Sequence, residues 1–278
     1  MELEKNTLYL VATPIGNLGD MTYRAVEVLS KADFIAAEDT RNSLGLLNHF
    51  NIKKPLVSYF EHNKRERGEQ IVSRIENGEI CALITDAGMP AISDPGCDIC
   101  ELCHDRGIKV SVIPGACAAV CALAASGLGN GRFCFEGFLS TAKKSRREHL
   151  ERAAAEERTM IFYEAPHKLT ATLGDMYEAF GDRRMVMARE LTKKFEEIKR
   201  TTIKEALEYY TENQPKGEFV LVVDGAPRRE KGGYTDEELK ERLKGLIASG
   251  MRKSEAVADV ARSTGEKKNR VYELSIDV

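Results

Sequence analysis

The sequence predicts an α/β protein with two lobes and a small helical C-terminal tail. Short apolar runs alternate with helix-periodic segments over the first half of the chain, a pattern typical of βαβ units in a mainly parallel sheet. Beyond residue 180, two strand-like runs follow one another with no helical segment between them, which favours a mixed second sheet. Residues 234–278 contain only helix-like segments. Together these three observations predict the fold class.

The N-terminal lobe is predicted to span residues 1–126, with strands and helices in alternation. Its strands are expected at Leu8–Ala12, Phe34–Ala37, Leu56–Tyr59, Ile80–Thr85 and Val110–Ile113. Its helices are expected at Thr22–Lys31, Ser43–Phe50, Arg65–Asn77, Asp98–Arg106 and Ala116–Ala125. The segment Ser126–Gly131 ends the lobe, because clustered glycines interrupt regular structure.

The second lobe is predicted to span residues 127–226, and the tail residues 234–278. Strands are expected at Phe133–Phe138, Thr159–Tyr163, Met185–Arg189, Phe195–Thr201 and Phe219–Val223. Helices are expected at Ser145–Glu156, His167–Phe180 and Ile203–Glu212, and in the tail at Asp236–Ala248, Lys253–Ser263 and Lys267–Leu274. A charged linker, Gly225–Gly233, joins the two parts. The tail's turn at Gly250–Ser254 is compatible with a helix-turn-helix and equally with a plain helical bundle.

Composition and charge argue against several classes of protein. The chain has 278 residues, of which 42% are hydrophobic, and this suits a folded core rather than wholesale disorder. Its net charge of −3 argues against a nonspecific DNA coat. The N-terminus lacks the pattern of a signal peptide, and the longest apolar run, Ala116–Ala125, is too short to cross a bilayer. Seven cysteines in such a chain predict reduced thiols in a cytoplasmic protein.

Three loops with the residues of ligand sites follow three predicted strands. Leu83–Gly96 combines two aspartates with glycines and prolines, and Ile113–Ala118 and Ala12–Asp20 follow two other strands. In an open α/β sheet, ligands bind outside the carboxyl ends of the strands, so these loops predict a small-molecule pocket. The first loop lacks the G-x-G-x-x-G fingerprint. Glu38 and Asp39 nevertheless keep a dehydrogenase or a Rossmann-type methyltransferase as a weak alternative.

Cysteine spacing and basic clusters each allow a second interpretation. Cys97, Cys100 and Cys103 have the spacing C-x-x-C-x-x-C, but no fourth ligand follows at a suitable distance, so buried small side chains are favoured over an iron–sulfur cluster. We therefore predict no metal. Basic clusters at Lys64–Arg67, Lys143–Arg147, Lys193–Lys194 and Lys267–Arg270 are usually solvated surface. Their distribution over the chain suits a nucleic-acid backbone better than a small acid.

Several motifs together resemble the tetrapyrrole methylase superfamily, and within it the branch that modifies ribosomal RNA. The opening Leu8–Asp20 has this resemblance, as do Ala37–Arg41, Thr85–Pro90, Ser93–Gly96, Phe133–Phe138 and Ala188–Lys193. The similarity covers about residues 7–225, and the tail is similar to that branch less distinctively. The resemblance implies a two-lobed α/β enzyme that binds S-adenosylmethionine. It also implies 2'-O-methylation of a cytidine in the decoding region of small-subunit (16S) rRNA, within the small ribosomal subunit, by a homodimer.

The resemblance also implies a set of residues for the cofactor site. Carried over by position, the contacts with S-adenosylmethionine fall on Pro14, Ile15, Gly16, Gly88, Met89, Pro90, Ile92, Cys117 and Ala118. Tetrapyrrole-modifying members have Gly-Asp-Pro where this chain has Gly88-Met89-Pro90. The missing acidic residue favours the RNA-modifying branch, although Asp86 lies nearby in the sequence.

A ribose hydroxyl is a poor nucleophile, so a carboxylate that accepts its proton should accelerate methyl transfer. We predict Asp39 and Asp86 in this role, and Glu38 and Glu164 are the second choices. Arg41 is expected to hold a phosphate or to orient a carboxylate, because a guanidinium donates in a planar fork.

Two other functions fit parts of the same sequence. The first is another methyltransferase of the superfamily, which would modify a tetrapyrrole carbon or a protein nitrogen. The second is a non-catalytic RNA-binding module that uses the C-terminal helices and binds no S-adenosylmethionine.

Overall fold

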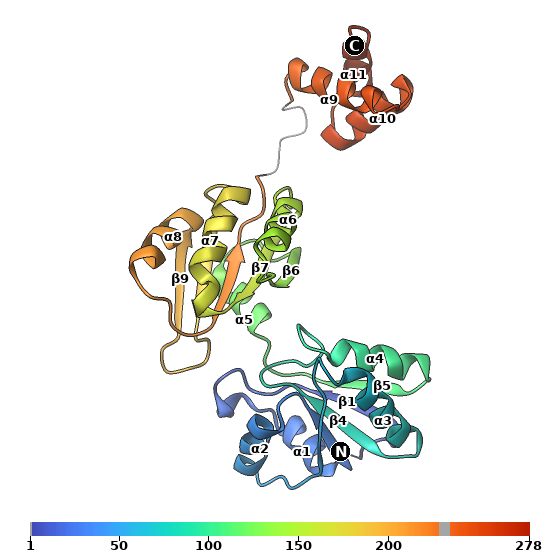
Figure 1. The fold of residues 1–278 in the computed structure, drawn as a ribbon, viewed down its shortest axis with the longest axis vertical. Helices are drawn as coiled ribbons and strands as arrows, with labels where there is room; N and C mark the ends of the chain where they lie inside the picture. The colour runs from blue at the N-terminus through green and yellow to red at the C-terminus, as the bar shows by residue number, and fades with distance from the viewer. Residues whose placement is uncertain (1, 228–233) are drawn as a thin grey trace. The chain divides into compact units, whose positions relative to one another are not determined.

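A computed structural model describes residues 2–227 and 234–278 of the chain (Figure 1). The chain forms two compact units, Met1–Ala226 and Pro227–Val278. The predicted charged linker includes residues 228–233, which lie outside the described residues. The predicted boundary between two lobes near residue 126 stays a prediction, since both sheets belong to the first unit.

The first sheet has five parallel strands in the order β3-β2-β4-β1-β5. They are β1 (Thr7–Val11), β2 (Phe34–Ala37), β3 (Leu56–Ser58), β4 (Ile80–Ile84) and β5 (Lys109–Ile113). The helices between them are α1 (Tyr23–Lys31), α2 (Thr40–His49), α3 (Lys64–Glu76) and α4 (Gly96–Asp105). A short 3-10 helix, η1 (Leu18–Asp20), follows β1. The predicted parallel N-terminal sheet is confirmed.

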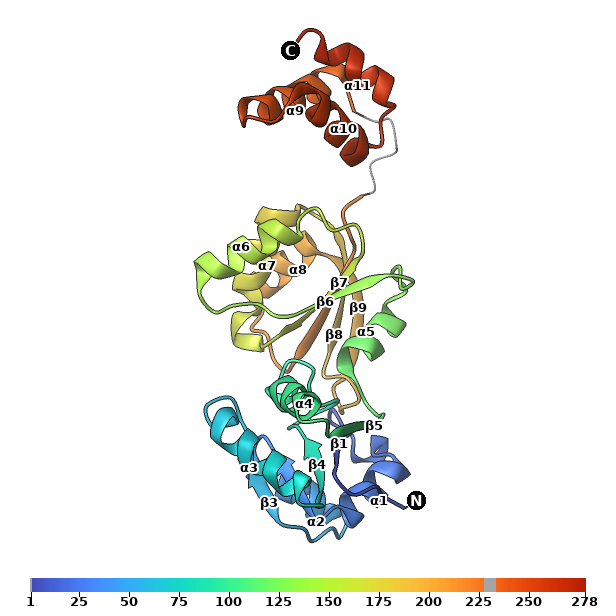
Figure 2. The same cartoon turned by 90° about the vertical axis from the view of Figure 1, so that its right-hand side faces the viewer.

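Helices cover both faces of the first sheet because its strands are apolar on both sides. Successive side chains of a strand point to opposite faces. Leu8 and Leu10 therefore pack with α3 and α4, whereas Tyr9 and Val11 pack with α1 and α2. Figure 2 shows the sheet from a second direction, with its helices around it.

The second sheet is mixed, as predicted, with the order β6-β7-β10-β8-β9. Its strands are β6 (Phe133–Phe138), β7 (Thr159–Glu164), β8 (Arg184–Arg189), β9 (Glu197–Thr202) and β10 (Phe219–Val223). Only the β6–β7 pairing is parallel among the pairings of these strands. One face carries α6 (Lys143–Ala153), α7 (Pro166–Phe180) and α8 (Ile203–Glu212), and α5 (Ala118–Ser126) covers the other.

The C-terminal unit is a bundle of three helices, α9 (Asp236–Ala248), α10 (Lys253–Thr264) and α11 (Lys268–Ser275). Its core contains Leu239, Leu243, Val257, Val260 and Val271. No helix within residues 2–227 or 234–278 has the length and apolar character that a membrane crossing requires.

Helices α2 and α4 are among those that begin earlier than the sequence predicts, and in each an aspartate is the local cause. Helix α2 starts at Thr40 rather than Ser43, because the Asp39 side chain caps it by accepting from the Arg41 amide at 2.8 Å. Helix α4 starts at Gly96 rather than Asp98, and Asp94 Oδ1 accepts from the Gly96 amide at 2.7 Å. Both aspartates hold the chain where a strand passes into a helix.

Candidate active site

A cavity of about 390 Å³ lies where strands of both sheets end. Its wall comes from the loops after β1, β2, β4 and β5 and from the cavity-facing ends of β6, β7, β8 and β10. A cavity of this volume is in the range of small-molecule and cofactor sites. The first-sheet side of the wall contains Ile15, Glu38, Thr85, Asp86, Ala87, Gly88, Met89, Ile92, Ser93, Asp94, Cys117 and Ala118. The second-sheet side contains Phe138, Tyr163, Glu164, Ala165, Ala188, Leu191, Lys193, Glu218, Phe219 and Val220.

Backbone hydrogen bonds tie the first loop to the central loop. The Thr13 amide donates to the Gly88 carbonyl at 2.9 Å, and the Gly88 amide donates back to the Thr13 carbonyl at 3.1 Å. Gly88 has a φ of +82°, and a Cβ there would stand 3.2 Å from Ile15 Cγ2. Glycine is therefore needed at this position for both its conformation and its size.

The central loop carries two further residues in the left-handed region. Ala91 and Ser93 both have a φ of +67°, which is uncommon for residues other than glycine and clusters at functional sites. Asp94 Oδ1 accepts from the amides of Ala91 and Gly96, whereas its buried Oδ2 has no hydrogen-bond partner among the described residues. Asp94 therefore fixes the shape of the loop through Oδ1, while Oδ2 is buried.

Three carboxylates gather after β2 and β4. Thr85 Oγ1 donates to Glu38 Oε2 at 2.6 Å, and the Asp39 amide donates to Asp86 Oδ1 at 3.2 Å. Asn42 Nδ2 donates to Asp86 Oδ2 at 3.3 Å. The Asp86 carboxylate thus stands near Glu38, which also lines the cavity, and near Asp39, which does not.

The environments of Asp39 and Asp86 move their pKa values in opposite directions. Arg41 donates to both carboxylate oxygens of Asp39, at 3.1 and 2.8 Å, and these bonds lower the Asp39 pKa to about 2. Desolvation, followed by the charge of Glu38, raises the pKa of Asp86 above its usual value of 3.8. Because a base works best with a pKa near the operating pH, Asp86 is the better proton acceptor of the two.

Lys193 reaches the cavity from the loop after β8. Its Nζ donates to Glu190 Oε1 at 2.9 Å and to Glu218 Oε2 at 2.8 Å. Burial opposes its charge, but these hydrogen bonds outweigh burial and raise its pKa. A Cβ on Gly16 would stand 2.5 Å from Lys193 Cγ. Gly16 therefore allows the lysine stem to pass close to the loop after β1.

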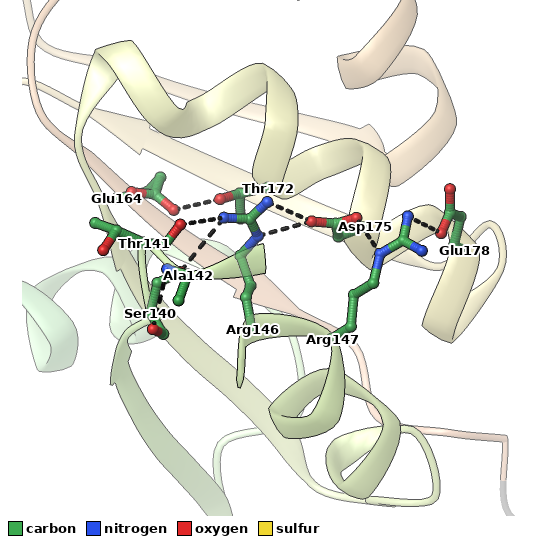
Figure 3. A network of polar contacts seen from close by, with 9 residues as sticks. All are labelled: Ser140, Thr141, Ala142, Arg146, Arg147, Glu164, Thr172, Asp175 and Glu178. Carbon is green, nitrogen blue, oxygen red and sulfur yellow. Dashed lines mark hydrogen bonds and ion pairs between the residues drawn. The ribbon is translucent and has the colours of Figure 1, made fainter. Parts of the chain in front are cut away.

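Glu164 is a buried carboxylate at the end of β7. It accepts from its neighbour's amide, that of Ala165, at 2.9 Å and from Thr172 Oγ1 at 2.6 Å (Figure 3). Ala165 is the residue before α7, and Thr172 lies within that helix. The helix therefore holds this cavity-lining side chain in one orientation.

The structure brings most of the predicted site residues to one cavity. Asp86 and the predicted cofactor residues Ile15, Gly88, Met89, Ile92, Cys117 and Ala118 line it. Pro14, Gly16, Pro90, Asp39 and Arg41 are not among its lining residues within residues 2–227 and 234–278. Gly16 and Asp39 each contact a residue that does line the cavity. The role of each of these residues stays a prediction.

Sequence reasoning missed most of the second-sheet wall. The sequence places Lys193 in a basic cluster that suits a nucleic-acid backbone and Phe138 in a motif that indicates no role, and it predicts no role for Tyr163 or Glu218. One rule could have predicted this side of the wall, namely that ligands bind outside the carboxyl ends of strands. The carboxyl ends of β6, β7 and β8 all lie at the same cavity. The predicted mixed sheet hid that signal, since strand direction in it was not known from the sequence.

The cysteines of α4 lie in different environments. Cys103 is buried in the core with Ile99, and Cys97 is exposed. Within the described ranges, no group of three or more His, Cys, Asp or Glu side chains could hold a metal ion.

Comparisons with known proteins add three findings. The family described as Tetrapyrrole (Corrin/Porphyrin) Methylases matches residues 7–207. The chain is 47% identical over 272 residues to "Ribosomal RNA small subunit methyltransferase I" of Synechocystis sp., with 98% of each chain covered. It is 45% identical over 274 residues to the protein of that name from Bacillus subtilis, covering 96% of this chain and 92% of the relative.

Solved structures share the fold at low sequence identity. Cobalt precorrin-4 methyltransferase matches with a TM-score of 0.58 and 18% identity, over 78% of this chain and 94% of that one. Diphthine synthase matches with a TM-score of 0.58 and 14% identity, over 78% and 90%. A uroporphyrin-III C-methyltransferase from Thermus thermophilus, complexed with S-adenyl homocysteine, matches with a TM-score of 0.54 and 17% identity, over 77% and 96%.

Proposed function

The chain belongs to the tetrapyrrole methylase family, and on that premise we propose that it transfers a methyl group from S-adenosylmethionine to small-subunit ribosomal RNA. The acceptor in this proposal is the 2'-hydroxyl of a cytidine in the decoding region. Relatives that cover nearly the whole chain at 41–47% identity support the substrate class, since all carry the name "Ribosomal RNA small subunit methyltransferase I". The observation that carries the chemistry is the acidic cavity where the strands of both sheets end.

The residues of the cavity fit S-adenosylmethionine in shape and charge. Ile15, Met89, Ile92 and Ala118 supply an apolar wall beside backbone turns, as sites for flat ligands generally do. The wall carries five carboxylates, those of Glu38, Asp86, Asp94, Glu164 and Glu218, against the single ammonium of Lys193. Such an excess of negative charge attracts a ligand with a sulfonium and an ammonium group.

When bound, S-adenosylmethionine supplies an activated methyl group on its sulfonium. The protein then has to orient the acceptor, exclude water and take up one proton. We assign the proton to an Asp86 carboxylate oxygen, because the raised pKa of Asp86 makes it the stronger base. Arg41 keeps Asp39 ionised, and its side chain is 89% exposed and reachable for a phosphate.

Three finer statements belong to the same proposal. The substrate is the small ribosomal subunit rather than free RNA, the enzyme acts in the cytoplasm where subunits are assembled, and it is a homodimer. The first two follow from the proposed acceptor, and the third from the family resemblance. Light scattering on the purified chain tests the third directly.

The test is methyl transfer from radiolabelled S-adenosylmethionine to small subunits of a strain that lacks this gene. We expect one label per subunit, and mass mapping of nucleosides should locate it on one 2'-O-methylcytidine. Uroporphyrinogen serves as the parallel acceptor. Label on uroporphyrinogen and none on subunits would move the chain to the tetrapyrrole-modifying branch, and no cofactor binding by calorimetry would favour a non-catalytic RNA-binding module.

A further inference from the structure

Three aromatic rings form a wall at the cavity that the cofactor chemistry leaves unused. We call Phe135, Phe138 and Tyr163 the aromatic wall. The ring centroids of Phe135 and Tyr163 are 5.0 Å apart, and those of Phe138 and Tyr163 are 5.3 Å apart. Phe138 and Tyr163 line the cavity itself. The wall is therefore continuous with the proposed active site.

A β-bulge places these rings on the same face. Side chains three positions apart on a regular strand, such as Phe135 and Phe138, point to opposite faces. The register of β6 against β7 shifts between Phe135 and Gly137, and an extra residue of this kind re-aims the side chains after it. Gly137 has a φ of +66°, and a Cβ there would stand 3.3 Å from Ser93 Oγ in the central loop. The bulge thus turns Phe138 toward the cavity.

The wall is unusually open for aromatic side chains. Phe138 is 55% exposed and Phe135 is 36% exposed, on a strand at the edge of its sheet. By contrast, Ala188 and Phe219, which also line the cavity, are buried. Phe138 therefore stands at the mouth, where a ligand larger than a cofactor would enter.

Tyr163 is held rigidly within the wall. Its hydroxyl accepts from the Ala119 amide at 3.1 Å, and burial raises its pKa to about 12. A fixed neutral ring gives a stacking surface that loses little side-chain entropy when a ligand binds.

Basic side chains follow the wall along the chain. Lys143 and Lys144 begin α6, five and six residues after Phe138, and both are exposed. Arg146 anchors this segment from within, since its Nε donates to Asp175 Oδ2 at 2.7 Å and its Nη1 reaches the carbonyls of Ser140 and Thr141 (Figure 3). Two exposed lysines thus begin a helix whose start is fixed and which follows the wall directly in the chain.

Exposed aromatics beside lysines are the combination that binds single-stranded nucleic acid, because bases stack on the rings and phosphates pair with the ammonium groups. We propose that the base of the methylated nucleotide, unstacked from its RNA neighbours, stacks on Phe138 of the aromatic wall, with Lys143 and Lys144 on flanking phosphates. This inference rests on the proposed function and names the part of the protein that receives the acceptor nucleotide.

The test compares Phe138→Ala with wild type for affinity toward small subunits of a strain that lacks this gene. Stacking of one base predicts a loss of about ten-fold to a hundred-fold. Phe138→Trp should retain binding, because it keeps a ring. Phe133→Ala is the matched control, since Phe133 is 40% exposed on the same strand and lies at its other end. Calorimetry with S-adenosylhomocysteine should give the same affinity for every variant.

The outcomes of this test distinguish a failure of the stacking inference from a failure of the proposed function. Unchanged subunit affinity of Phe138→Ala, with wild type active on subunits, overturns the stacking inference and leaves the proposed function standing. Reduced affinity of Phe138→Ala, with no methyl transfer by wild type, ends the proposed function and with it the methylated nucleotide as the occupant, and leaves only an RNA contact at Phe138. A change from dimer to monomer in light scattering, with subunit affinity unchanged, assigns the wall to a second copy of the chain and overturns the inference.

Discussion

The two sides of the cavity wall are built in different ways. On the first-sheet side, backbone turns carry the wall, and Thr13 and Gly88 are joined by two backbone hydrogen bonds. On the second-sheet side, long side chains such as Phe138 and Lys193 reach in from strand ends and loops. A wall of backbone fits one invariant ligand by shape, whereas a wall of exposed side chains suits a larger partner. On our proposal, the cofactor binds the first-sheet side of the cavity and the RNA binds the second-sheet side.

The largest expected effect comes from the base on the first-sheet side. Asp86→Asn keeps the shape of the side chain and removes its ability to accept a proton. Single-turnover methylation should fall by about a hundred-fold to ten-thousand-fold. Asp39→Asn is the matched control and should lose less, because asparagine still caps α2. Near-normal rates for Asp86→Asn would remove Asp86 from the mechanism.

The ion pair that anchors the start of α6, on the second-sheet side, should contribute chiefly to the stability of the protein. Arg146 and Asp175 form a buried ion pair whose side chains are 10% and 6% exposed. Arg146→Ala leaves a buried carboxylate with the half-exposed Arg147 as its remaining ion-pair partner, and should lower the free energy of unfolding by about 3 kcal/mol. Arg158→Ala, which breaks an exposed pair with Glu156, should cost less than about 1 kcal/mol. Urea denaturation measures both, and equal losses would contradict the assignment of an anchor.

Glycine 88 tests whether backbone shape controls the cofactor side. Gly88→Ala puts a Cβ at a φ of +82° and 3.2 Å from Ile15, which should cost about 1–3 kcal/mol of stability and weaken S-adenosylhomocysteine binding. Gly45→Ala is the control, because Gly45 lies in α2 with nothing within 4 Å of an added Cβ. It should be neutral or stabilising by about 1 kcal/mol. Calorimetry and urea denaturation separate the two effects, and unchanged cofactor affinity for Gly88→Ala would argue against control by backbone shape.

The smallest expected effect is a fall in the methylation rate at low pH, which forms an acidic limb in the plot of rate against pH. Asp86 acts as a base only when ionised, so the rate should fall as pH drops through its pKa. That pKa is raised above 3.8, whereas Asp39, at about 2, stays ionised over the same range. Rapid-quench single-turnover rates from pH 8 to pH 5 measure the limb. A limb that persists unchanged in Asp86→Asn would assign the titration to another group.

The sequence predicts the fold well because the pattern of hydrophobic residues determines where strands and helices form. Strands such as Phe34–Ala37 and Phe219–Val223 are found at their predicted limits. Helix starts are less predictable, as α2 shows, because Asp39 can serve as a cap or as a site residue and the sequence does not distinguish the two roles. In this structure it caps the helix and also contacts Asp86.

The site was only half visible in the sequence, for a physical reason. Loops such as Leu83–Gly96 can be predicted from their glycines, prolines and aspartates, because these residues favour turns through the conformation of the local backbone alone. The direction of Phe138 depends on the bulge after Phe135 and on pairing with β7, both of which are tertiary properties. Without that tertiary information, an aromatic residue in a strand is predicted to pack in the core.

A crystal structure with S-adenosylhomocysteine tests the central claim most directly. The account predicts the nucleoside against Ile15, Gly88 and Ala118, with its sulfur turned toward Asp86 and with Phe138 still open at the mouth. Density for the ligand outside this cavity, or clear density lying across the aromatic wall instead, would contradict it.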